Sequence, residues 1–130
     1  MALPNGAGGY QLGDGNLNEV ILSVQSPPIS KAATATLTAA ELANGIIVYT
    51  GSTAALTVPL GVDMDAAFPS MKVNSCFDFF IINTSGSTAT VTANTGCTLV
   101  GVAAVVTLTS CNWRVRKSAD ATYVFNRIAG

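Results

Sequence analysis

The chain has 130 residues, a length that fits one domain, since single domains most often hold roughly 100 to 150 residues. Charged side chains make up only 10% of the chain and hydrophobic ones 49%, whereas a typical soluble domain is about 25% charged. A chain with so few charges either covers itself with small polar residues or buries part of its surface against a partner. We expect the second, and a monomer coated with Thr and Ser is the alternative.

The balance of charge and the short apolar runs limit the partners that we expect. A net charge of −1 offers no positive field that could hold a nucleic acid backbone. The longest apolar runs, such as GIIV and GVAAVV, are far shorter than the roughly 18 to 20 residues that cross a bilayer. The first residues have neither the basic start nor the apolar core of a secretory signal. We therefore expect no nucleic acid partner, no membrane span and synthesis in a cytoplasm.

Residues 1–33 differ in composition from the rest, and we expect them to form an extended N-terminal arm. A glycine-rich start and the pair Pro27 and Pro28 deny this region regular structure of its own. Between them lies the run NEVILSV, which is too apolar for a freely solvated tail. The alternative is that this run is the first β-strand of the domain. We predict that the arm contacts a partner through its apolar side chains: Leu17, Val20, Ile21, Leu22 and Val24.

From residue 34 to residue 130, short β-prone runs alternate with turn residues such as NG, TSGS and NTG. This rhythm is typical of an all-β sandwich or barrel. We expect one β-sandwich domain over this range. Its predicted strands are 34–37, 46–50, 55–60, 76–83, 89–93, 98–100, 105–109, 113–117 and 122–128.

Two short helical turns are predicted between these strands. In the first, 38–43, Thr38 is followed three residues later by Glu41, which is the pattern of a capping box, and an Asn-Gly pair should end the turn. The second, 62–68, carries Asp63 and Asp65 near its start and is followed by a proline. We interpret these two carboxylates as helix-capping groups that favour the positive end of the helix.

Side chains alternate between the two faces of a strand, so a strand with two apolar faces is buried on both sides. In 76–83 neither face is plainly polar, and the same holds for 122–128. In 113–117 we expect Trp113, Val115 and Lys117 to face the core. A second apolar face favours burial against another subunit or the arm. We predict a partner or trimer contact on the outer face, through Phe80, Ile82, Arg114 and Arg116. The alternative for the two arginines is a solvated strand face that discourages edge pairing.

The residues that usually carry catalysis are scarce. Histidine is absent, so a Ser-His-Asp or Cys-His site cannot form in this sequence. Asp63 and Asp65 are the only close acidic pair, and two residues apart on a helical turn they point to different faces. We expect no enzyme activity, no cofactor and no bound metal. Three cysteines at Cys76, Cys97 and Cys111 are predicted to be free, buried thiols in a reducing compartment, with a bridge from Cys97 to Cys111 as the alternative.

Four stretches carry a resemblance to a known kind of protein: LTAAELANGIIVYTG, TVPLGVDMDAAFP, SCFDFFIINTSGSTATVTANTGCTLVG and WRVRKSADATYVFNRIA. Together they resemble small capsid decoration, or cement, proteins of tailed bacteriophages, including cyanobacterial ones. The resemblance implies a jelly-roll-like β-sandwich that forms a homotrimer on the outer surface of an icosahedral shell and binds the major capsid protein. It carries over no catalytic residues.

Two functions of different kinds follow as hypotheses. The first is a virion structural protein that cements a capsid through its arm and one apolar sheet face. The second is a receptor-binding or carbohydrate-binding β-module of a phage fibre, because similar β-domains also occur there. A sugar binder needs an exposed aromatic ring beside polar groups. The aromatic residues lie inside predicted strands, so the sequence favours the first hypothesis.

Overall fold

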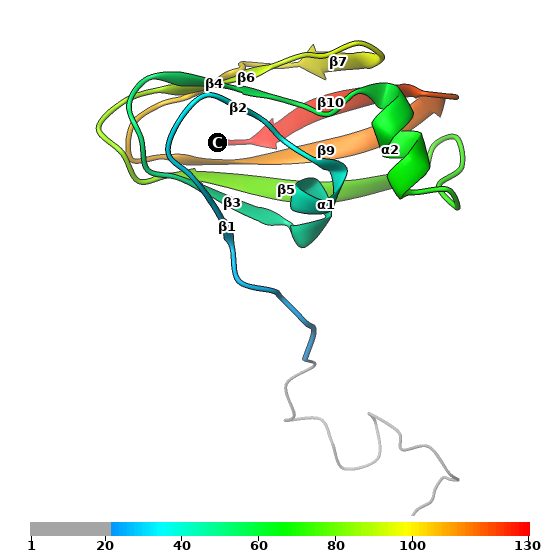
Figure 1. The fold of residues 1–130 in the computed structure, drawn as a ribbon, viewed down its shortest axis with the longest axis horizontal. Coiled ribbons are helices and arrows are strands. Elements are labelled where there is room, and N and C mark those ends of the chain that lie inside the picture. The colour runs from blue at the N-terminus through cyan, green and yellow to red at the C-terminus, as the bar shows by residue number, and fades with distance from the viewer. Residues whose placement is uncertain (1–21) are drawn as a thin grey trace, which may run out of the picture.

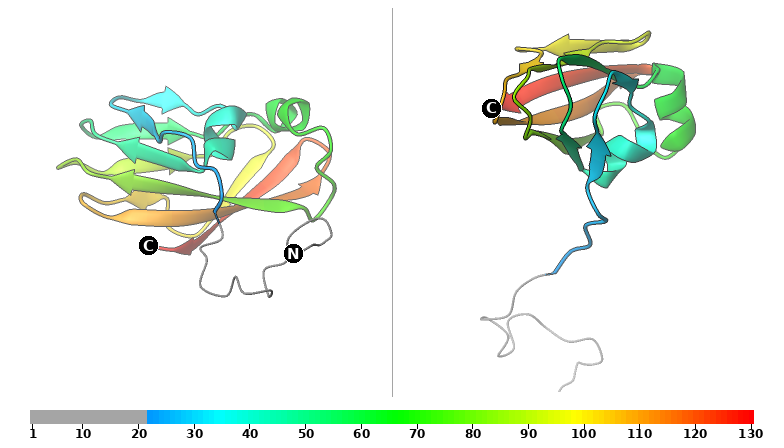
Figure 2. Two further views of the ribbon diagram at one scale, coloured as in Figure 1. Left: turned by 90° about the horizontal axis from the view of Figure 1, so that it is seen from below. Right: turned by 60° about the vertical axis from the view of Figure 1, so that its left-hand side comes forward.

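A computed structural model describes residues 22–130 (Figure 1). Strands hold 45% of these residues and helices 12%, and the strands form two sheets. The expectation of a mainly β domain is therefore confirmed. The two sheets lie face to face, and both helices lie together at one end of the sandwich (Figures 1 and 2).

The larger sheet has six strands in the order β1-β3-β5-β9-β10-β7. Two of its long strands, β9 and β10, form an antiparallel hairpin with a two-residue loop, in which Ala121 has a positive φ of 51°. The strands of this sheet are β1 (Ile29–Lys31), β3 (Ile46–Tyr49), β5 (Cys76–Asn83), β7 (Cys97–Val100), β9 (Ser110–Ala119) and β10 (Thr122–Ala129).

The smaller sheet has four short strands in the order β2-β4-β6-β8. They are β2 (Ala35–Thr36), β4 (Ala54–Thr57), β6 (Ala89–Thr92) and β8 (Ala104–Val105). The chain alternates between the sheets from β1 to β9, so that successive strands of one sheet come from separate passages of the chain. As a result, five of the eight strand pairs in the described residues are parallel. A jelly roll is built from antiparallel Greek keys, so this part of the expectation is not confirmed.

Helix α1 (Ala39–Asn44) begins and ends as the sequence predicts. The Glu41 N–H donates to the Thr38 hydroxyl at 3.2 Å, and the Thr38 N–H donates to the Glu41 carboxylate at 2.9 Å. Gly45 ends the helix with φ of 99°, a conformation that glycine adopts without strain. The capping box and the glycine stop are confirmed.

Helix α2 (Gly61–Ala67) lies where the second helical turn was predicted, but its start differs. The N-cap is Leu60, and no side chain caps the helix there. Asp65 lies in the middle of the helix and bonds to the β9–β10 hairpin, so its interpretation as a capping group is wrong.

The core fills the space between the sheets. Along β9 the inward residues Trp113, Val115 and Lys117 are buried, as predicted from the alternation. The largest fully buried side chains are Trp113, Tyr49, Tyr123, Phe79, Phe125, Leu37, Leu42, Ile47, Leu56, Met64, Ile81 and Val58.

Two segments differ from the sequence-based strands. Residues 29–31, within the expected arm, form β1 and pair with β3 at the edge of the larger sheet. The predicted strand 105–109 is reduced to Ala104–Val105, because Leu108 adopts a positive φ of 58° in a turn that leads into β9. β-Propensity alone does not reveal such a turn.

Candidate interaction surface

The outer face of the six-stranded sheet exposes large apolar side chains. Along β5, Phe79 and Ile81 point into the core, whereas Phe80 and Ile82 point outward and are 43% and 37% exposed. Both residues were predicted from the sequence as partner contacts. The structure places them two residues apart on one face, as the strand period requires.

Strand β3 extends this apolar surface. Ile46 pairs with Phe80, and Val48 pairs with Ile82, so the four side chains form a two-by-two array on adjacent strands. Ile46 and Val48 are half-buried, whereas their neighbours Ile47 and Tyr49 are in the core. The sequence analysis missed these two residues, although the alternation within IIVY would have assigned them to the outer face. We call Ile46, Val48, Phe80 and Ile82 the apolar array.

On the other side of β5, strand β9 brings polar groups to the same face. Asn112 pairs with Phe80, and Ser110 pairs with Ile82. A shallow hollow of about 250 Å³ opens there, lined by Phe80, Ser110, Cys111, Asn112, Ala129 and Gly130. The buried Oδ1 atom of Asn112 has no hydrogen-bond partner in the domain. An unpaired buried acceptor of this kind is costly to the folded domain.

The charges on the outer face lie beyond the apolar array. Arg114 donates to both carboxylate oxygens of Asp78, from Nε at 2.7 Å and from Nη2 at 3.0 Å. This bidentate pair holds the pKa of Asp78 below its usual value. Arg116 donates to the side-chain oxygen of Asn74 at 2.9 Å. Arg114 is therefore already paired within the chain. An acidic group of a partner, which the sequence analysis predicted Arg114 to bind, would have to compete with Asp78.

The described part of the arm exposes its apolar side chains. Leu22 is 85% exposed and Val24 is 97% exposed. The next residue, Gln25, is fixed to the domain, because its side-chain amide donates to the Asn44 carbonyl at 2.8 Å. Asn44 in turn donates to the Pro27 carbonyl at 3.1 Å. The other predicted arm contacts, Leu17, Val20 and Ile21, lie outside the described residues.

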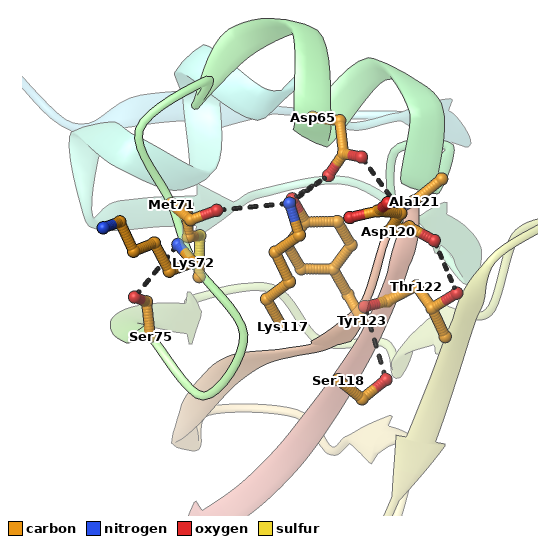
Figure 3. A network of polar contacts seen from close by, with 10 residues as sticks. All are labelled: Asp65, Met71, Lys72, Ser75, Lys117, Ser118, Asp120, Ala121, Thr122 and Tyr123. Atoms are coloured by element: carbon orange, nitrogen blue, oxygen red, sulfur yellow. Dashed lines mark hydrogen bonds and ion pairs between the residues drawn. The ribbon is translucent and has the colours of Figure 1, made fainter.

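A polar cluster joins α2 to the β9–β10 hairpin (Figure 3). Asp65 accepts hydrogen bonds from the Tyr123 hydroxyl at 2.6 Å and from the Ala121 N–H at 2.7 Å. The buried Lys117 ammonium lies 3.1 Å from Asp65 and also donates to the Met71 carbonyl at 3.2 Å. The Tyr123 hydroxyl and Lys117 hold the pKa of Asp65 low, while burial and Asp65 raise the pKa of Tyr123.

This cluster was not predicted, although a lysine on the core face of β9 signalled a need for a buried partner. Its groups are engaged with one another and with the backbone. The arrangement therefore fixes α2 against the hairpin rather than presenting a free acid or base.

A larger pocket lies between the helices and the end of β2. It has a volume of about 520 Å³ and a mostly apolar lining, in which Asp63 contributes a carboxylate. No aromatic side chain lines it: Thr36, Leu37, Thr38, Ala39, Ala40, Pro59, Leu60, Asp63, Ala67 and Asn94. The pocket therefore lacks the ring on which a sugar would stack.

The cysteines are free, but only two of them are buried. Burial raises the pKa of the Cys97 thiol to about 11, and it also raises that of Cys111. Cys76 is exposed at the start of β5, so the prediction that all three are buried is wrong for this residue. Side chains alternate along β5, so with Phe79 in the core, Cys76 lies on the outward face of the strand.

Within residues 22–130, no group of three or more Cys, Asp or Glu side chains is arranged to hold a metal ion. Neither of the two helices in this range has the length and apolar character needed to span a bilayer. Comparisons with protein-family models, with curated proteins and with solved structures found no match.

Proposed function

We propose that this protein is a virion structural protein that decorates and cements the icosahedral head of a tailed bacteriophage. It would bind the major capsid protein on the outer surface of the shell as a homotrimer, after synthesis in the host cytoplasm. The jelly-roll-like form of the sandwich stays a prediction of the resemblance to decoration proteins. The observation that carries the proposal is the uncovered apolar array on the outer face of the six-stranded sheet.

The surface chemistry supports a role in assembly. Phe80 and Ile82 are large apolar side chains at the centre of a sheet, where a solvated face would carry polar residues. The ion pair on the same face is neutralised internally, so it repels neither another copy nor a neutral partner. A ligand that binds only the assembled shell stabilises that shell by mass action, and a trimer multiplies each weak contact.

The fibre hypothesis has weaker support. A carbohydrate site needs an exposed aromatic ring beside polar groups, and Trp113, Tyr49 and Tyr123 are fully buried. Phe80 is the exposed large aromatic residue in the described range. It has the polar Asn112 beside it on β9, but Ile46 on β3 and Ile82 on its own strand give most of its surroundings an apolar character. This environment favours a protein contact over a sugar.

We also propose that the protein is not an enzyme. The sequence has no histidine, and the most elaborate polar cluster binds its own members together. A catalytic group needs an accessible acid, base or nucleophile beside a substrate pocket. Asp63 is the one carboxylate that lines the 520 Å³ pocket, and the lining contains no second acid and no Lys, Cys or Tyr beside it. The Asp65 cluster shares no residue with this pocket.

Electron microscopy of phage particles labelled with an antibody against this domain tests the proposal. We expect regularly spaced label over the head, and none on fibres. Label confined to fibre tips would support the alternative, and particles without any label would contradict both hypotheses. A substitution control uses Phe80→Asp, which should abolish head binding, and Val62→Asp, which lies on α2 with 60% exposure and should not.

A further inference from the structure

Two apolar surfaces of this chain are left uncovered by the domain that carries them. One is the apolar array of Ile46, Val48, Phe80 and Ile82. The other is the pair Leu22 and Val24 in the arm, which are the most exposed large apolar residues in the described range. Each surface loses contact with water only if something packs on it.

The base of the arm lies beside the apolar array. Gln25 bonds to Asn44, the residue before Gly45. The Gly45 carbonyl accepts a hydrogen bond of 2.8 Å from the Phe80 N–H, and Gly45 immediately precedes Ile46. The arm thus leaves the domain at the edge of the array.

The arm extends away from the four-stranded sheet, on the side that the outer face of the six-stranded sheet occupies (Figures 1 and 2). Pro27 and Pro28 restrict the backbone of its base to an extended form, and the bonds between Gln25 and Asn44 fix its direction. A molecule that packs against this face would meet the arm as well.

The two surfaces match in period. Leu22 and Val24 are two residues apart, so in an extended chain they share one side and lie about 6 to 7 Å apart. Phe80 and Ile82 have the same spacing on β5, as do Ile46 and Val48 on β3. An extended segment laid along these strands places both of its apolar side chains on the array.

We propose that Leu22 and Val24 of one copy pack on the apolar array of a neighbouring copy. Such a contact joins two different surfaces, arm to face, and repeated contacts of this kind close into a ring when the rotation between copies allows it. Three copies give the homotrimer of the proposed function, on which this inference rests. The directed exit of the arm disfavours packing on its own array, because the chain would have to reverse beside the fixed Gln25.

Disulfide trapping in the full chain tests this exchange. The exposed Cys76 is first replaced by Ser, which leaves the buried Cys97 and Cys111 as the remaining thiols. One protein then carries Leu22→Cys and a second carries Ile82→Cys. On mixing under mild oxidation we expect a disulfide that joins an arm peptide to a sheet peptide of another chain, identified by mass spectrometry. Partners carrying Val62→Cys in place of Ile82→Cys should give at least tenfold less of it.

A chain that carries both Leu22→Cys and Ile82→Cys distinguishes a contact between two chains from a contact of the arm with its own domain. Arm exchange predicts covalent dimers and trimers on a non-reducing gel. A monomer with an internal disulfide would overturn the proposal, and so would trapping no greater than in the Val62→Cys control. Particle labelling in parallel separates this result from the proposed function, because a protein that decorates heads without trapping would refute only the exchange.

Discussion

Tyr123 donates a hydrogen bond of 2.6 Å to Asp65, and this contact links the β9–β10 hairpin to α2 (Figure 3). Lys117 approaches the same carboxylate from β9 at 3.1 Å. One side chain of a seven-residue helix therefore connects two strands of the larger sheet. A helix this short is unstable alone, so its position depends on such tertiary contacts.

Replacing Asp65 with Asn should make stability less dependent on acid pH. Its lowered pKa means that the folded protein binds the proton less tightly than the unfolded chain does. The stabilisation is fully present above the ordinary carboxyl pKa of 3.8 and is lost as the pH falls below it through the lower folded value. We would measure the free energy of unfolding in urea at neutral pH and near pH 3. This free energy should fall less between the two pH values for Asp65→Asn than for the parent protein. At neutral pH the parent should be the more stable of the two.

The matched control for this prediction is Asp63→Asn, on the exposed side of the same helix. It should leave the free energy of unfolding at neutral pH closer to that of the parent than Asp65→Asn does, because the hairpin contacts of α2 are made by Asp65. If the free energy of unfolding falls equally with pH in the parent and in Asp65→Asn, the contact with Tyr123 does not contribute to folding stability.

Gly61 lies where α2 meets the hairpin loop, and a side chain there should be destabilising. A Cβ atom at this position would lie 1.9 Å from the Ala121 carbonyl oxygen, so the backbone would have to move. We expect Gly61→Ala to cost about 1 to 3 kcal/mol in free energy of unfolding, as overpacking does in other cores. Gly86, whose added Cβ would meet nothing within 4 Å, is the control. A Gly61→Ala protein as stable as Gly86→Ala would contradict this close approach.

The cysteines should react in two classes. Cys97 and Cys111 are buried with raised pKa values, and thiolates are the reactive form, so both should resist a thiol reagent in the folded protein. Cys76 is exposed and should react at once. Titration at neutral pH should count one thiol before unfolding and three after it. Cys76→Ser should remove the early reaction, and any fast reaction left in that variant would show that the core is open.

The arm should matter for assembly and not for the folding of the domain. Leu22 and Val24 touch little of their own domain, so at concentrations low enough for the chain to be a monomer, replacing both with Asp should leave the free energy of unfolding within about 0.5 kcal/mol of the parent. The same variant should fail to decorate phage heads. Full occupancy with unchanged affinity would show that the arm is not a contact.

The sequence predicts the local features of this fold well. The capping box of Thr38 and Glu41 and the stop at Gly45 define α1, because these signals act over a few residues. The alternation along β9 correctly separates the buried Trp113 and Val115 from the exposed Arg114. The ends of α1 and the two faces of β9 both depend on residues that are close in sequence, which is why the sequence predicts them.

The sequence predicts distant pairings poorly. The contact between Asp65 and Tyr123 joins residues 58 positions apart, and no local pattern contains it. The alternation of strands between two sheets likewise depends on long-range pairing, so hairpin signals alone suggested a more antiparallel fold. The two-residue period of β5 predicts that Phe80 is exposed. Neither this period nor residue propensity predicts which surface packs on Phe80 in an assembly.

Sedimentation velocity of the full chain at micromolar concentration tests most directly whether the outer sheet face is an interface between copies. The proposal predicts a species of three times the 13.2 kDa chain mass, which Phe80→Asp converts to a monomer and Val62→Asp leaves intact. Circular dichroism should show both variants folded, because both side chains are exposed. A parent protein that sediments only as a 13.2 kDa species across this concentration range would contradict the interface.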